Sequence, residues 1–97
     1  LRNGDEMFRI TDGKGFGIKF ENGMTVSVQF GAGNYCENYR GDFSQNEELG
    51  RKGSINAECA VIDKDGEFIQ LPSWTDSVNG YMTADEVGKL IAFVQQQ

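Results

Sequence analysis

The fold is decided by residues 16–30, which read Phe16-Gly-Ile-Lys-Phe-Glu-Asn-Gly-Met-Thr-Val-Ser-Val-Gln-Phe30. Apolar side chains alternate along both arms of this stretch, which is typical of two strands that each bury one face. A two-residue turn at Asn22 and Gly23 would divide the apolar side chains between both faces of the hairpin. A three-residue loop at 21–23, with Gly23 at positive φ, brings them to one face, so we predict that loop. The cross-strand pairs are then Phe20 with Met24, Ile18 with Val26, and Phe16 with Val28.

The hairpin extends into a three-stranded meander. Residues 7–11 form a strand candidate, which a glycine-containing turn at 12–15 joins to the hairpin. Residues 1–6 are expected to be a flexible lead-in. Beyond the hairpin, residues 31–56 are polar, hold five glycines and show no sustained period, so we expect a long loop. A connection of this length in a small domain tends to be functional or else disordered.

A second hairpin comes after the long loop. Strands at 57–62 and 67–71 are joined by a three-residue loop at 64–66, which again gathers apolar residues on one face. Residues 73–81, which carry Trp74, are expected as loop. The cross-strand pairs of this hairpin are Val61 with Ile69 and Cys59 with Leu71.

The last segment has the clearest helical pattern. Thr83 and Glu86 match a capping box, in which each side chain satisfies the other's backbone N–H. Gly88 weakens the helix by about 1 kcal/mol relative to alanine, and we interpret it as allowing close approach to a strand. The apolar stripe that can bury against the sheet consists of Val87, Leu90, Ile91 and Val94.

These patterns predict a single α+β domain over residues 1–97. Its antiparallel sheet has about five short strands in two hairpins, and the C-terminal helix packs on one face. A net charge of -6, with 9 basic residues, disfavours direct binding to a nucleic-acid backbone, which requires Lys and Arg. Such a charge suits contact with a basic protein surface, although it also simply keeps a small domain soluble. No apolar run approaches the ~20 residues that span a bilayer, and no leader precedes the domain, so we expect a cytoplasmic protein without membrane contact.

The residues of common catalytic sites are missing. The chain has no histidine, which removes the usual nucleophile pairs and most zinc sites. The run Asp63–Gly66 resembles the opening of a calcium loop, but Phe68 and Trp74 occupy the positions that need Gly and Glu. Gly31-Ala32-Gly33 lacks the third glycine and the helix of a dinucleotide site. We therefore predict no catalytic residue, no metal site and no cofactor.

The two cysteines show no Cys-x-x-Cys spacing. Cys59 lies among small apolar residues and is expected to be buried, whereas Cys36 lies in the long loop and can be exposed. Both are expected to be reduced thiols. Whether they pair is left open by the sequence.

Aromatic residues recur every four positions in the long loop, beside amides and one cation. Rings in such a setting can stack on a flat base or anchor a protein partner. Two interpretations stay open, because Tyr35 and Phe43 can instead fold back over one end of the core, and Trp74 can cap a sheet edge. If the loop is a recognition surface, its binding residues are Asn34, Tyr35, Tyr39, Arg40 and Trp74.

Two segments, 20–36 and 57–66, resemble small uncharacterised proteins encoded by bacteriophages and prophages. The likeness depends on Gly33-Asn34-Tyr35-Cys36 more than on the generic hairpins. It implies no known activity or catalytic residue. It does imply a context in which small proteins without catalytic motifs act by binding, either blocking a host defence complex or sequestering its nucleotide messenger.

Three function classes are compatible with these features. The favoured hypothesis is a non-enzymatic binding module of phage or mobile-element type in the bacterial host cytoplasm, whose partner is a host protein or a small nucleotide-like ligand. The alternative is a structural or assembly protein that forms a homo-oligomer through a free sheet edge or the helix. A small hydrolase that depends on carboxylates or Cys36 is the least supported class.

Overall fold

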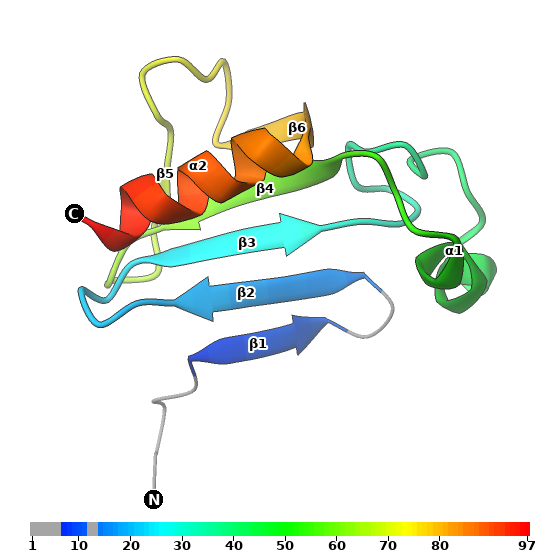
Figure 1. The fold of residues 1–97 in the computed structure, drawn as a ribbon, viewed down its shortest axis with the longest axis horizontal. Coiled ribbons are helices and arrows are strands. Elements are labelled where there is room, and N and C mark those ends of the chain that lie inside the picture. Colours follow the sequence, from blue (N-terminus) through cyan, green and yellow to red (C-terminus); the bar gives the residue numbers. More distant parts are fainter. Residues whose placement is uncertain (1–6, 12–13) are drawn as a thin grey trace, which may run out of the picture.

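The computed structural model describes residues 7–11 and 14–97. The predicted lead-in at 1–6 and half of the predicted turn at 12–15 lie outside these residues. Six antiparallel strands form one sheet, and the C-terminal helix crosses one of its faces (Figure 1). The elements, in chain order, are β1 Phe8–Thr11, β2 Gly15–Lys19, β3 Thr25–Gln29, a 3-10 turn Phe43–Gln45, α1 Asn46–Lys52, β4 Ala57–Ile62, β5 Phe68–Ile69, β6 Val78–Met82 and α2 Ala84–Gln95.

The register of the first hairpin confirms the prediction. Ile18 pairs with Val26 and Phe16 with Val28. The three-residue loop is closed by the Phe20 amide, which donates to the Met24 carbonyl at 2.9 Å. Gly23 has φ 88°. Burial of one apolar face thus overrides the commoner two-residue turn.

The far edge of the sheet differs from the prediction. In the second hairpin Val61 pairs with Ile69 as expected, but β5 is only two residues long. Cys59 pairs with Asn79 of β6, so the predicted pairing of Cys59 with Leu71 is wrong. The prediction that residues 73–81 form a loop is also wrong in its last part, because Val78–Met82 form β6. Both β5 and β6 pair with the edge of β4 that β3 leaves free.

Helix α2 covers β3 and β4 and completes the core (Figure 1). Leu90 and Val94 are buried against Val26 and Val61, and Val87 and Ile91 pack at the rim of the same cluster. The predicted stripe is therefore confirmed. The capping box is also confirmed, because the Thr83 amide donates to Glu86 Oε1 at 2.8 Å and the Glu86 amide donates to Thr83 Oγ1 at 3.2 Å.

Gly88 does not allow the close approach to a strand that the sequence analysis predicts. Its position is exposed, and a Cβ built there would meet nothing within 4 Å. None of the described strands approaches it. The glycine thus costs the helix about 1 kcal/mol without any gain in packing.

The segment 31–56, predicted as a long loop, contains the 3-10 turn and the short helix α1, so the loop prediction is wrong over this part. Exposed ion pairs join Arg51 to Glu47 at 2.7 Å and Lys52 to Glu48 at 3.9 Å. This i,i+4 spacing supports a helix weakly and is visible in the sequence. Cys36 of the same segment is buried rather than exposed, and both cysteines are free thiols.

Candidate functional site

Three tyrosines gather on the surface at the end of the sheet. The rings of Tyr35 and Tyr39 stack with centroids 5.2 Å apart and an interplanar angle of 15°, and Tyr81 lies tilted 6.4 Å from Tyr35. Their residues remain 46%, 37% and 54% exposed, respectively. We call these three residues the tyrosine cluster. The predicted aromatic loop supplies two of its members, and Tyr81 comes from β6.

Strand β6 fixes the position of Tyr35. The Tyr81 amide donates to the Tyr35 carbonyl at 2.8 Å, and the Tyr35 amide donates to Glu58 Oε2 at 3.2 Å. A Cβ added at Gly80 would lie 2.4 Å from the Tyr35 Cβ, so this close approach requires glycine. The loop is therefore attached to two strands of the sheet, β4 and β6.

Hydrogen bonds within the loop hold its shape. The Gly33 amide donates to the Tyr39 carbonyl at 3.0 Å, and the Tyr39 amide donates to the Cys36 carbonyl at 3.0 Å. Glu37 links the loop to the start of β4, because its amide donates to Asn56 Oδ1 at 2.6 Å and its Oε1 accepts from the Ile55 amide at 3.1 Å. Two of the cluster's rings are thus presented by an ordered turn rather than by a free chain.

The backbone of Tyr81 adopts a conformation that few residues other than glycine take. Its φ is 55°, in the left-handed region. Such positions cost free energy and persist only where the surroundings enforce them. Here the hydrogen bond to Tyr35 and the start of α2 at Ala84 both constrain the strand end.

The other predicted binding residues lie in different environments. Asn34 is half-buried and donates to the Phe30 carbonyl at 2.6 Å, so it shapes the loop. Arg40 is exposed beside Tyr39 in the sequence. Trp74 is only 8% exposed and belongs to the core cluster, as in the interpretation in which it caps the sheet. Trp74 is therefore not part of the exposed tyrosine cluster, whereas Tyr81, which the sequence analysis did not select, is.

Phe43 does not cover the core. It is exposed and packs beside Gly33, while the Lys14 ammonium lies 5.6 Å from its ring centroid. Together with the exposed Tyr35, this leaves the core-covering interpretation of the loop without support. No local pattern indicates that Lys14 and Phe43 meet, because they are far apart along the chain.

The described residues offer little reactive chemistry. No three of their His, Cys, Asp or Glu side chains are grouped so that they could hold a metal ion. Burial, with a smaller contribution from the charge of Glu58, raises the pKa of the Cys59 thiol to about 12, so this thiol stays protonated at neutral pH. The Cys36 thiol is buried and points to the Gly31 carbonyl at 3.6 Å. At Asp63, Oδ1 accepts from the amides of Asp65 and Glu67 in the turn between β4 and β5, so the predicted hairpin is present.

Comparison with known proteins gives no relative: no family model, no curated protein and no solved structure matches this chain. None of the helices in the described part of the chain has the length and apolarity needed to cross a membrane.

Proposed function

We propose that this chain is a non-enzymatic binding module of phage or mobile-element type, which acts in the bacterial cytoplasm on a host protein such as a component of anti-phage defence. The tyrosine cluster would be its docking surface. The observation that carries the proposal is that the Tyr35 ring pairs with the rings of Tyr39 and Tyr81 outside the core, on backbone that the sheet holds in place.

Tyrosine suits such a surface for physical reasons. Its ring buries a large area and loses little conformational freedom, so tyrosines are frequent among the residues that dominate binding energy. A loop already ordered by hydrogen bonds has less entropy to lose when a partner binds. The net charge of -6 favours a partner with a basic surface around the contact.

The proposal predicts a large loss of affinity when two rings are removed. Affinity capture from the bacterial host and mass spectrometry would identify the partner, and calorimetry with the purified partner would measure binding. We expect the double variant Tyr35→Ala, Tyr39→Ala to bind at least roughly 30-fold more weakly, since the loss of a single dominant interface residue costs about 2 kcal/mol or more.

The matched control is Phe93→Ala, which removes an exposed ring from α2 instead. It should leave the affinity unchanged. Circular dichroism must show that each variant is folded. If the folded double variant binds its partner as tightly as the unchanged protein, the tyrosine cluster is not the docking surface.

Self-association is a second candidate function, and the exposed apolar side chains of edge strand β1 favour it. This strand is an edge of the described sheet, and its apolar residues Phe8 and Ile10 are both largely exposed. Exposed apolar edge strands pair readily with another chain. Sedimentation velocity should then show a dimer that Ile10→Lys dissociates, whereas a monomer at every concentration would exclude this candidate.

A further inference from the structure

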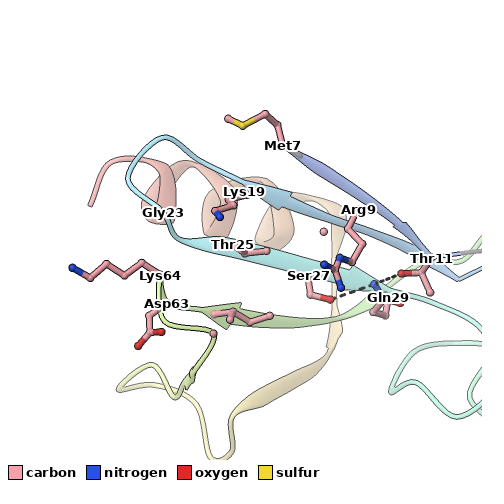
Figure 2. A pocket seen from close by; sticks show the side chains of 13 residues that line it. Met7, Arg9, Thr11, Lys19, Gly23, Thr25, Ser27, Gln29, Asp63 and Lys64 are labelled. Carbon is pink, nitrogen blue, oxygen red and sulfur yellow. Dashed lines mark hydrogen bonds between the residues drawn. The ribbon is translucent and has the colours of Figure 1, made fainter. Parts of the chain in front are cut away.

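A hollow of about 720 Å³ lies on the face of the sheet opposite α2 (Figure 2). Its position follows from the alternation of side chains along β3. Val26 and Val28 enter the core, so Thr25, Ser27 and Gln29 project to the other face. The volume lies within the range of sites that bind small molecules.

The floor of the hollow contains Gly17, which is buried in the middle of β2. Gly17 stands in register between Arg9 of β1 and Ser27 of β3. A glycine inside a strand weakens the strand and often marks a place where a ligand approaches the backbone closely. No neighbour forces glycine here, because a Cβ at Gly17 would make only ordinary contacts, the nearest at 3.6 Å with Thr25.

Positive charge collects around this floor although the chain as a whole is acidic. Arg9, Lys19 and Lys64 line the hollow, and among the described residues of its lining Asp63 is the one carboxylate. In Figure 2, Lys19 and Lys64 lie at the end next to Gly23, and the Lys64 side chain extends outward, away from Lys19. Arg9 lies nearer to Gln29 at the opposite end.

The two lysines lie close together because Lys19 precedes a turn that touches the turn of Lys64. Lys19 ends β2 just before the loop that contains Gly23, and a Cβ at Gly23 would lie 2.9 Å from the Lys64 Cβ. Neither ammonium forms an ion pair with another residue of the described chain. The Asp63 carboxylate accepts the amides of Asp65 and Glu67 through its Oδ1.

We propose that this hollow binds a small molecule that carries phosphate groups, with the phosphates beside Lys19, where the exposed Lys64 side chain turns inward to meet them. Lysine ammonium groups bind phosphate as point charges. Hydroxyl groups of Thr25 and Ser27 add neutral hydrogen-bonding capacity along the floor. The rest of the ligand would lie over Gly17 toward Arg9. This site is separate from the tyrosine cluster and does not depend on it.

The test is titration of isotope-labelled protein with sodium pyrophosphate, and separately with ADP, at constant ionic strength. Amide shifts should saturate and concentrate at residues 17–19, 25–29 and 62–66. Lys19→Gln and Lys64→Gln should each weaken binding roughly tenfold, as expected for a charge-assisted hydrogen bond. The matched control is Lys89→Gln, which removes an exposed lysine from α2 and should have no effect.

The two ligands distinguish the source of the phosphate. If ADP binds more tightly than pyrophosphate and this difference disappears in Gly17→Ala, the ligand is a nucleotide. If ADP and pyrophosphate bind with equal affinity, the site recognises phosphate groups alone. The double variant Tyr35→Ala, Tyr39→Ala should bind either ligand normally, so failure of the proposed docking surface does not affect this result. The proposal is overturned if neither ligand gives saturating shifts in the hollow at millimolar concentration, or if Lys89→Gln weakens binding as much as Lys19→Gln.

Discussion

Replacing Gly15 with alanine is expected to lower the free energy of unfolding by roughly 3 kcal/mol or more. Gly15 has φ 144°, a region that side-chain-bearing residues rarely enter. A Cβ there would lie 2.0 Å from the Val28 carbonyl oxygen, which is backbone within the central part of the sheet. Relief would require movement of β2 against β3. Urea unfolding, followed by the fluorescence of the buried Trp74, measures the loss.

Gly17 is the matched control, two residues along the same strand. A Cβ at this position makes only ordinary van der Waals contacts. Gly17→Ala should therefore change the free energy of unfolding by less than about 1 kcal/mol, or even stabilise the strand. Equal stability of Gly15→Ala and Gly17→Ala would contradict the strain assigned to Gly15.

The parts of the fold that the sequence predicts correctly depend on local patterns. The register between Phe16 and Val28 follows from period-2 alternation, which the three-residue loop satisfies and the two-residue turn does not. The helix start at Thr83 follows from a motif of four residues. In each case the deciding interactions lie between residues close together in the chain, where the sequence pattern expresses them directly.

The strand β6 could not be found in this way. Its sequence, Val78-Asn-Gly-Tyr-Met82, has no alternation, and glycine and asparagine disfavour a strand. The glycine is required by Tyr35, which is far away in the sequence. Tyr81 was missed as a member of the tyrosine cluster for the same reason. Contact between distant segments, not local propensity, decides this end of the molecule.

Asn22 gives a second example of a distant interaction. The sequence pattern predicts it only as part of a turn, yet its Nδ2 donates to the carbonyls of Val94 at 2.9 Å and Gln97 at 3.1 Å. Val94 lies in the last turn of α2 and Gln97 lies just beyond its end, where carbonyls lack partners within the helix. The hairpin loop thus caps the helix. Nothing in the sequence near either segment indicates that they meet.

Replacing Leu90 with alanine is expected to lower the free energy of unfolding by roughly 2–5 kcal/mol, the range for buried leucines. Leu90 is 6% exposed and packs in the core with Val26 and Val61. Its truncation removes apolar contact between α2 and the sheet and leaves a cavity. Chemical denaturation measures the loss of stability. Because α2 begins directly after β6, a loosened helix also weakens the constraint on Tyr81, so amide exchange at residues 78–82 should be faster in the variant.

The matched control on the same helix is Phe93→Ala. Phenylalanine is the larger side chain, so apolar size alone would predict the greater loss at this position. Phe93 is 51% exposed, however, and its removal should change the free energy of unfolding by only about 0.5 kcal/mol. A larger loss for Phe93→Ala than for Leu90→Ala would mean that α2 packs on the sheet by another face. The stripe through Leu90 and Val94 would then not be the contact that holds the domain together.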